Sequence, residues 1–205
     1  SAAMMVDGEL VAACEEERYT KVKHSREFPS KAIDDCLHLG GVGIEDIDEI
    51  AFGFDPIYHI QEAYLKAALL APERINLLLQ DVDRIGEKYK TEEMIRKKTG
   101  YRGQIAYYNH HSCHLASAYY PSGFSEAIVA SYDGIGEIET GLLGVGRYGA
   151  IELFHSNSRF PDSFGLLYSA ITYFLGWQHH CDEGIVMGLA TYGDPHNTVL
   201  GTDKT

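Results

Sequence analysis

Two histidines separated by three residues, His110 and His114, have a spacing that suits metal chemistry. On a helix this spacing puts both imidazoles on one face, close enough to bind one metal ion. The pair follows a strand-like run, and open sheets commonly bind ligands at such strand-to-helix junctions. Asp133 follows the next predicted strand and offers a carboxylate oxygen. We therefore predict a divalent metal site of His110, His114 and Asp133, with iron, manganese and zinc all chemically suitable.

A glycine-rich turn continues from this aspartate in the order Asp133-Gly134-Ile135-Gly136-Glu137. Glycines at the end of a strand let backbone N–H groups approach an anion closely, because no Cβ stands in the way. We predict that Gly134, Gly136 and Glu137 contact a phosphate-bearing cofactor. The alternative is an ordinary turn between two strands, and the histidines upstream favour the binding site.

A short cationic cluster lies near the N-terminus and comprises Arg18, Lys21, Lys23 and His24. Guanidinium and ammonium groups bind phosphate oxygens through charge-assisted hydrogen bonds. We predict that Arg18 and Lys23 contact an anionic substrate. The alternative is a solvated loop.

A block near the C-terminus combines candidate ligands with spaced glycines. Residues 179–182 read His-His-Cys-Asp, but consecutive side chains cannot all point at one ion, so we do not predict a second metal site there. Gly184 and Gly188 follow, and their spacing permits either close approach of a ligand to the backbone or tight helix packing. Gly184 is therefore a candidate cofactor contact.

The elements that would position these residues are short strands alternating with helices. Apolar runs and alternations predict strands over 2–6, 9–14, 50–54, 104–108, 127–132, 141–148 and 151–156. Helical apolar spacing predicts helices over 31–39, 58–70, 72–99, 114–120 and 163–175. Asp7-Gly8 between the first two strands is typical of a β-hairpin turn. The alternation indicates an α/β fold.

Capping signals and apolar stripes refine the predicted helices. Ser30 is the expected N-cap of the first helix, and Gly40-Gly41 its end. The helix over 163–175 is expected to be buried, because most of its residues are apolar. One face of the helix over 72–99 is expected to form a core stripe of Ile75, Leu78, Leu79, Val82, Ile85 and Tyr89.

Composition narrows the functional classes. The chain has 205 residues, of which 45% are hydrophobic, enough for a packed core. A net charge of −13 argues against the broad basic surface that DNA or RNA binding requires. No apolar run is long enough to span a bilayer, and no secretion leader is evident. The four cysteines form no Cys-x-x-Cys pair, which favours reduced thiols. We expect a cytoplasmic protein with no nucleic-acid or membrane partner.

Four blocks of the sequence, taken together, indicate a protein family more specifically than any one block does alone. They are 15–18 (EEER) with Lys23-His24 and Phe28-Pro29, then 109–124 (NHHSCHLASAYYPSGF), then 133–137, and finally 163–176 with 183–193. In this order they resemble the N-terminal domain of the carbamoyltransferases that include the nodulation protein NodU and the antibiotic O-carbamoyltransferases. The resemblance covers nearly the whole chain.

The resemblance implies a fold as well as a family. It implies the ribonuclease H-like α/β fold of actin, hexokinase and the heat-shock ATPases, with mixed sheets. Residues 1–126 would form the first lobe, lacking its first strand and carrying a helical insertion over 58–100. Residues 127–205 would begin a truncated second lobe. The chain is thus expected to be a fragment that holds most of the first lobe and part of the second.

The resemblance also implies a reaction. A carbamoyl group would pass from carbamoyl adenylate to a hydroxyl of a small-molecule or sugar acceptor. A separate domain, related to the YrdC fold, would make that adenylate from carbamoyl phosphate and ATP. His110, His114 and Asp133 match the family's metal positions beside the nucleotide, with iron expected first and manganese or zinc as alternatives. Gly184 lies where a nucleotide contact is expected. The general base would be either His111 or a histidine in the missing first turn. The fragment alone is expected to be inactive.

Three other functions stay open at this point. A tRNA threonylcarbamoyltransferase would share the metal site, although the charge of −13 counts against tRNA binding. A sugar kinase or an ATPase of the same superfold would need no histidine pair. A non-catalytic structural fragment is the third alternative. The acceptor and the oligomeric state are likewise open.

Overall fold

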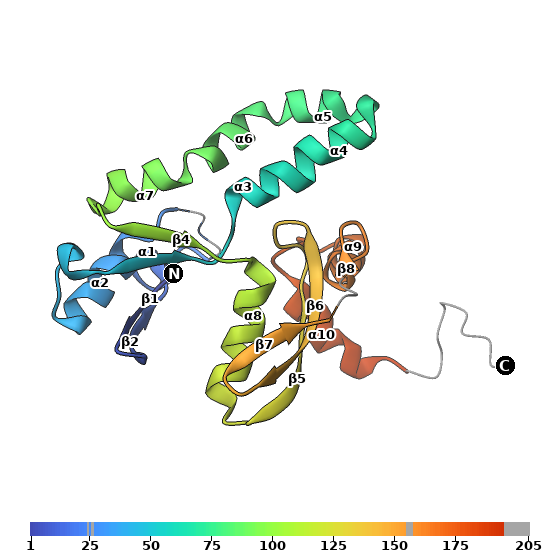
Figure 1. The fold of residues 1–205 in the computed structure, drawn as a ribbon. Helices are drawn as coiled ribbons and strands as arrows, with labels where there is room; N and C mark the ends of the chain where they lie inside the picture. Colours follow the sequence, from blue (N-terminus) through green and yellow to red (C-terminus); the bar gives the residue numbers. More distant parts are fainter. Residues whose placement is uncertain (24, 26, 155–157, 195–205) are drawn as a thin grey trace.

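The computed structural model describes residues 1–23, 25, 27–154 and 158–194 of the chain, and Figure 1 shows their fold. These residues form small separate sheets with helices beside them, which confirms the predicted α/β class. The strands are β1 (Ala2–Val6), β2 (Glu9–Cys14), β3 (Glu49–Phe52), β4 (Gln104–Tyr107), β5 (Glu126–Tyr132), β6 (Glu139–Arg147), β7 (Ala150–Leu153) and β8 (Ser158–Arg159).

The helices account for most of the remaining described residues. The α-helices are α1 (Glu16–Thr20), α2 (Ser30–Gly40), α3 (Pro56–His59), α4 (Ala67–Leu70), α5 (Ile75–Gln80), α6 (Val82–Tyr89), α7 (Thr91–Thr99), α8 (His110–Tyr119), α9 (Phe164–Phe174) and α10 (Glu183–Leu189). Short 3-10 helices lie at Ile44–Asp46, Pro72–Arg74, Tyr120–Ser122 and Ala190–Tyr192, and a π-helix spans Ile60–Lys66. Among the described residues, no helix is both long and apolar enough to cross a membrane.

β1 and β2 form the predicted antiparallel hairpin. The turn residues Asp7 and Gly8 have φ values of 50° and 85°, which fit a type I′ turn. α2 packs across both strands, and the core between them contains Met4, Ala12 and Cys36. The hairpin and α2 therefore form one small packed unit.

The N-terminus of α2 differs from the prediction. Ser30 is already a helical residue, so the prediction that it is the N-cap is wrong; Pro29 holds that position and makes no side-chain cap. The reason is a carboxylate from outside the helix. Glu16 on α1 is buried, and its Oε2 accepts a hydrogen bond from the Ala32 N–H at 2.8 Å. A carboxylate there also interacts favourably with the helix dipole.

β3 and β4 pair in parallel, with Phe52 opposite Tyr107. A parallel pair needs a crossover of at least about a dozen residues, and the segment between these strands provides it. The Tyr108 N–H donates to the Phe52 carbonyl at 2.9 Å and prolongs the pairing. Both strands end at the same edge, so Gly53 and Asn109 emerge side by side. This edge carries the candidate site.

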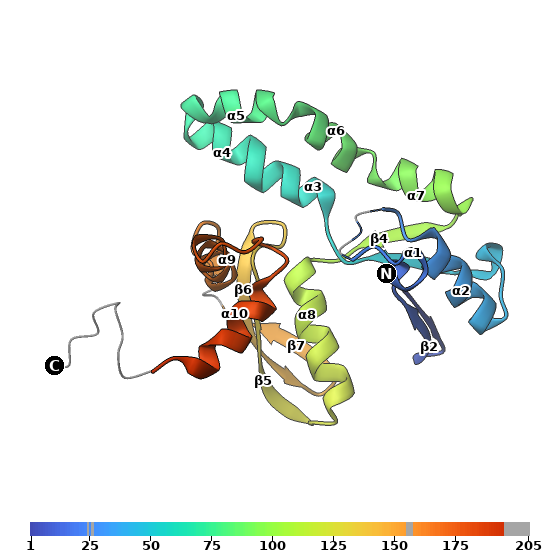
Figure 2. The same ribbon diagram turned by 180° about the vertical axis from the view of Figure 1, so that it is seen from behind.

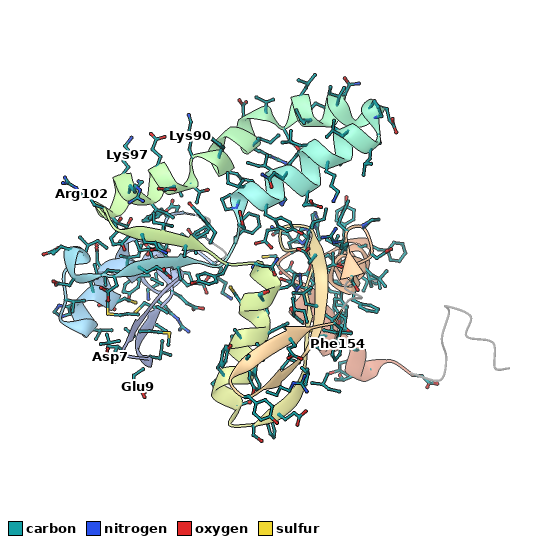
Figure 3. The ribbon with its side chains drawn as sticks, in the orientation of Figure 1. Asp7, Glu9, Lys90, Lys97, Arg102 and Phe154 are labelled. Carbon is teal, nitrogen blue, oxygen red and sulfur yellow. The ribbon has the colours of Figure 1, made fainter. Side chains whose placement is uncertain are left out.

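Residues 56–99, called the helical arm below, form the crossover. They project from the rest of the chain as a helical hairpin in both ribbon views (Figures 1 and 2). The prediction of one continuous helix over 72–99 is wrong, because the helix is interrupted at Asp81 and Lys90. Figure 3 shows Lys90 and Lys97 on the outer side of the arm's second leg, and Arg102 just beyond its end.

The predicted core stripe of the arm is also wrong. Among its members, at least half of the surface is exposed for Ile75, Leu79, Val82 and Tyr89. An amphipathic stripe is buried only where another layer covers it. The arm leaves the body of the chain instead of packing along it, so the described residues provide no such layer.

The third sheet is antiparallel in the order β5-β6-β7, and β8 also pairs with β6. α8 packs on β5 and β6 through a buried cluster of Leu115, Tyr119, Val129 and Leu142. The expected lobe boundary at residue 126 coincides with the first residue of β5. α8, which precedes that boundary, nevertheless packs on the sheet that follows it.

α9 and α10 complete the described part of the chain. The predicted helix over 163–175 is confirmed, with Ser163 as its N-cap. The expectation that it is buried is wrong, because Phe164, Tyr173 and Phe174 are largely exposed. β7 ends at Leu153, so the last predicted strand is shorter than expected. Residues 155 and 156 of that prediction, and 195–205 of the predicted second lobe, lie outside the described residues.

Candidate metal centre

The orientation of α8 about its own axis determines which of its histidines face solvent. His111, Leu115 and Tyr119 recur every fourth residue and are buried against the sheet. This buried face leaves His110 and His114 on the neighbouring face of the same helix. The helix begins at His110, four residues earlier than predicted, because Asn109 caps it by accepting from the Ser112 N–H at 3.0 Å. Both histidines of the predicted pair are therefore helical.

Three side-chain atoms converge at the start of α8. His110 Nε2 lies 3.0 Å from His114 Nε2 and 3.1 Å from Asp133 Oδ2. His114 Nε2 lies 3.3 Å from the same oxygen. The three side chains are 32%, 47% and 44% exposed, in the order His110, His114, Asp133, so the group is open to solvent on one side. The structure thus brings together the three residues that the sequence predicts as metal ligands.

The second ring nitrogen of His110 faces a backbone carbonyl. His110 Nδ1 lies 3.3 Å from the Gly53 carbonyl, which can only accept, so a hydrogen on Nδ1 would suit this contact. In that tautomer Nε2 would offer its lone pair to a bound ion. A hydrogen bond of this kind fixes the orientation of metal-binding histidines in general.

The geometry of the three atoms fits one divalent ion. Two ligand atoms at right angles on an ion with bonds of about 2.1 Å lie about 3.0 Å apart. His110 Nε2 and His114 Nε2 lie 3.0 Å apart, a distance that suits either one N–H hydrogen between them or an ion bound by both. Two histidines and one carboxylate suit iron, manganese and zinc, and thiolates, which would favour softer ions, are absent from the described group.

Asp133 is oriented by its own loop. Its Oδ1 accepts from the Gly134 N–H at 2.6 Å, which turns Oδ2 toward the histidines. Burial favours the neutral acid, but the Gly134 N–H and the two histidines outweigh it, and the pKa of Asp133 is lowered. The carboxylate is therefore available as an anionic ligand.

The Asp133 loop rests on the start of α9. The Ser163 hydroxyl lies 3.0 Å from the Asp133 carbonyl and 2.7 Å from the Gly134 carbonyl, and it caps α9 by accepting from Leu166 N–H. A Cβ on Gly165 would lie 2.5 Å from Gly134 N and 2.6 Å from the Asp133 carbonyl oxygen. Only glycine fits there without moving the loop.

Replacing Gly165 by alanine is therefore expected to displace Asp133 and weaken metal binding. Changes in the supporting contacts of metal ligands typically reduce affinity by about 10–100-fold, and we expect a loss of this size. Metal titration by calorimetry measures it. Gly188→Ala on α10 is the matched control, because no atom lies within 4 Å of its added Cβ. Equal affinity of both variants and the parent protein would contradict the expected role of Gly165.

Glu137 supports two helices from a buried position. Its side chain is fully buried and accepts from the Asp55 N–H at 2.7 Å, the His110 N–H at 3.1 Å and Asn109 Nδ2 at 3.0 Å. The Glu137 carbonyl also accepts from His59 Nδ1. The carboxylate therefore anchors the N-terminus of α8 and the start of the helical arm. A cofactor contact of Glu137 stays a prediction.

His111 is likewise structural. It is fully buried, its Nε2 donates to the Glu139 carbonyl at 2.9 Å, and its Nδ1 pairs with the Ser131 hydroxyl at 2.8 Å. Burial lowers the pKa of His111, which keeps the imidazole neutral. With both nitrogens occupied and no exposed surface, the side chain cannot reach an acceptor hydroxyl. This burial counts against His111 as the general base, whereas a role for His111 in proton transfer stays a prediction.

The two glycines of the turn have partners within their own loop. The Gly134 N–H donates to Asp133 Oδ1, and the Gly136 N–H donates to the Glu139 carbonyl at 2.8 Å. Gly136 also lies against α8, since a Cβ there would be 3.0 Å from His111 Cδ2 and 3.1 Å from His110 Cβ. Close packing on the histidine helix accounts for this glycine, and contact with a cofactor stays a prediction.

The remaining predicted residues lie apart from this group. Arg18 is exposed on α1 and pairs with Glu15 at 3.4 Å, and Lys23 is exposed after α1. Neither shares a recorded interaction with the metal group among the described residues. Gly184 lies in the first turn of α10, with open space where a side chain would be. Their substrate and cofactor roles stay predictions. His24, the fourth member of the cationic cluster, lies outside the described residues.

Several supporting residues escaped the sequence analysis: Gly53, Asn109, Ser131, Glu139, Ser163 and Gly165. Asn109 and Ser163 carried a signal, since each precedes a helix and is a typical N-cap. Glu139 is buried and accepts from Tyr58 at 2.9 Å and Arg159 at 3.1 Å. Burial opposes its ionisation, but these donors outweigh it and lower the pKa of Glu139. Its partners are distant in the chain, so spacing could not reveal it.

Comparisons with known proteins agree on one family. A family model described as Carbamoyltransferase N-terminus matches residues 1–204. Nodulation protein NolNO of Sinorhizobium fredii is 35% identical over 95% of this chain and 28% of its own length. The uncharacterized protein sll1178 of Synechocystis sp. is 34% identical over 100% of this chain and 34% of its own length. Nodulation protein NolO of Bradyrhizobium diazoefficiens is 43% identical over 42% of this chain and 16% of its own length. The chain spans about a third or less of the length of these relatives.

Proposed function

The chain belongs to the carbamoyltransferase N-terminus family, and on this premise we propose that it supplies the metal-binding part of a carbamoyl-transfer site. The observation that carries the proposal is the convergence of His110 Nε2, His114 Nε2 and Asp133 Oδ2 within 3.3 Å of one another. The acceptor in this proposal is a hydroxyl of a small molecule or a sugar. The carbamate ester and AMP are the products.

The proposed donor is carbamoyl adenylate, made from carbamoyl phosphate and ATP by a domain outside this chain. The support for this donor is the resemblance of the four sequence blocks to family members. We also propose the actin–hexokinase–heat-shock ATPase arrangement for the complete domain. The separate sheets of this chain are compatible with that arrangement, since each could be one part of a larger mixed sheet.

His110, His114 and Asp133 would hold the divalent ion, with iron the first candidate. A bound divalent ion supplies Lewis-acid stabilisation of developing negative charge on a carbonyl or phosphoryl oxygen. The Gly53 carbonyl holds His110 with its Nε2 toward His114 and Asp133, and the Gly134 N–H holds Asp133 with its Oδ2 toward the two histidines, so these three atoms would hold the ion. The open side of the group would leave room for donor and acceptor. The buried His111 supports α8.

The test of this function uses the full-length protein with ATP, carbamoyl phosphate and a panel of sugar and small-molecule hydroxyl acceptors. We expect a carbamate ester and AMP to form only when both ATP and carbamoyl phosphate are present. Mass spectrometry of the acceptor measures the ester. Phosphorylated acceptor in the absence of carbamoyl phosphate would identify a kinase instead, and modification of tRNA alone would identify a tRNA-modifying enzyme.

Removing the metal gives a second prediction for the same assay. After treatment with a chelator, we expect carbamoyl transfer to fall to background, because two imidazoles and a carboxylate alone cannot offset developing negative charge. Addition of ferrous iron, manganese or zinc to separate samples should restore the rate and rank the ions. Full activity in a metal-free sample, verified by elemental analysis, would contradict a catalytic ion.

A further inference from the structure

Two cysteines meet beneath α2, in the hairpin unit and away from the metal centre. Cys14 is the last residue of β2, and its partner across the hairpin is Ala2. Cys36 lies on the buried face of α2, and its thiol donates to the carbonyl of that same Ala2 at 3.5 Å. Cys14 packs against the core cluster that contains Cys36. The fold therefore brings together two thiols that are far apart in the sequence.

The surroundings of the two thiols differ. Cys36 is 3% exposed, and burial, followed by its hydrogen bond with the Cys14 thiol, raises the pKa of Cys36 to about 11. Cys14 is only partly buried, and its thiol lies 3.7 Å from Asp35 Oδ2, which also accepts from the Tyr19 hydroxyl. Cys14 is thus the accessible thiol and Cys36 the protected one.

We propose that Cys14 and Cys36 are a modification site: a thiol pair that closes to an intramolecular disulfide when a small-molecule disulfide is present. The bond would join the end of β2 to the middle of α2. It would enclose residues 15–35, the segment that carries α1 and the exposed Arg18 and Lys23. The proposal does not depend on the carbamoyl-transfer function.

The reaction is a pair of thiol–disulfide exchanges. The Cys14 thiolate attacks the small-molecule disulfide, forms a mixed disulfide and releases one small thiolate. The Cys36 thiolate then attacks the Cys14 sulfur and releases the second small thiolate. The two protons of the cysteines pass to the two released thiolates, and the small disulfide is the two-electron oxidant. Because little of Cys36 is thiolate near neutral pH, the second step is expected to be slow and to accelerate as the pH rises.

The test maps thiols in the full-length protein after incubation with glutathione disulfide. Trypsin separates the two cysteines, because Arg18, Lys21, Lys23, Arg26 and Lys31 lie between them. Residues 32–66 contain no cleavage site before Lys66. We expect one species in which the peptide ending at Arg18 is joined to the peptide 32–66. Its mass should equal the sum of both peptides less two hydrogens, and a reducing agent should split it.

Matched variants separate this pair from the other thiols. Cys14→Ser and Cys36→Ser should each abolish the linked species, whereas a Cys113→Ser, Cys181→Ser double variant should retain it. Full alkylation of both Cys14 and Cys36 after oxidation would overturn the proposal, and so would a link from either to Cys113, to Cys181 or to a second chain. The peptide mapping is done on the parent protein. It therefore decides the test even if one of the variants fails to fold.

Discussion

Full-length protein in which both His110 and His114 are alanine is expected to bind no divalent ion at this centre and to lose carbamoyl transfer. Each imidazole supplies one of the converging atoms, and Asp133 alone cannot retain the ion. The stabilisation of the transition state that is lost amounts to several kcal/mol, which corresponds to a reduction of the transfer rate by about 10²–10⁴-fold. Elemental analysis measures the metal, and ester formation under saturating donor and acceptor measures the rate.

The control for this double variant is His38→Ala. His38 is an exposed histidine on α2, outside the metal centre, so its loss should change neither metal content nor rate. Because His110 and His114 lie on the open side of α8, their removal should leave the far-UV circular dichroism unchanged. A folded double variant with normal metal content and turnover would remove the basis of the proposed function.

Glu137→Ala is expected to have the largest effect on stability. The substitution leaves the Asp55 and His110 N–H groups without their acceptor and opens a cavity at a fully buried position. The lost hydrogen bonds to the buried carboxylate and the lost side-chain volume together lower the free energy of unfolding by about 3–5 kcal/mol. Amide hydrogen exchange should accelerate by about 10²–10³-fold in peptides from α8 and α3, because both helices begin at this carboxylate.

Two comparisons define the role of this carboxylate. Glu126→Ala removes an exposed glutamate at the start of β5 and should leave exchange in α8 unchanged. Glu137→Gln keeps the side-chain shape and one acceptor oxygen, but it places an NH2 group among N–H donors. Its amide exchange in α8 should therefore be faster than in the parent protein and slower than in Glu137→Ala. Unaltered exchange in α8 of Glu137→Ala would show that the anchor is not needed.

Local signals predicted much of the fold. Asp7-Gly8 predicted the hairpin, because few other dipeptides adopt positive φ at both positions. The strand over 127–132 and the helix over 163–175 followed from apolar patterns that the structure confirms within one residue. Ser30 shows the limit of such signals. A serine before an apolar run is a sound N-cap prediction, but a carboxylate from α1 provides the cap in this chain.

Patterns on one helix did not reveal what lies beside it. The stripe over 75–89 and the apolar helix α9 were both expected to be buried, yet many of their large side chains are exposed, including those of Leu79 and Phe174. Apolar periodicity predicts a face that another layer can cover; it does not predict that the described chain contains the layer. Burial depends on how elements pack against one another, so an apolar pattern in the sequence predicts it less reliably than it predicts secondary structure.

The convergence of His110, His114 and Asp133 was predictable, because the histidine spacing is local and these residue types are distinctive. His110 and His114 share a helix face, and Asp133 ends the adjacent strand. The supporting contacts were not predictable, because Gly53, Ser163 and Gly165 reach the group from distant segments. The burial of His111 and Glu137 was not predictable for a related reason. Residue type suggests chemistry, but only the fold shows whether a side chain is buried.

The helical arm makes one region of the chain tolerant of changes in length. Its first turn is held by the hydrogen bonds of Asp55 and His59 to Glu137, whereas Leu69 and Leu70 near its tip are about four-fifths exposed. The entropic cost of a longer connection grows only with the logarithm of its length. Residues added or removed at the tip would therefore leave the register of β3 on β4 intact. Evolution can remodel that tip, or an experimenter can insert a reporter there, while the three ligand atoms keep their spacing.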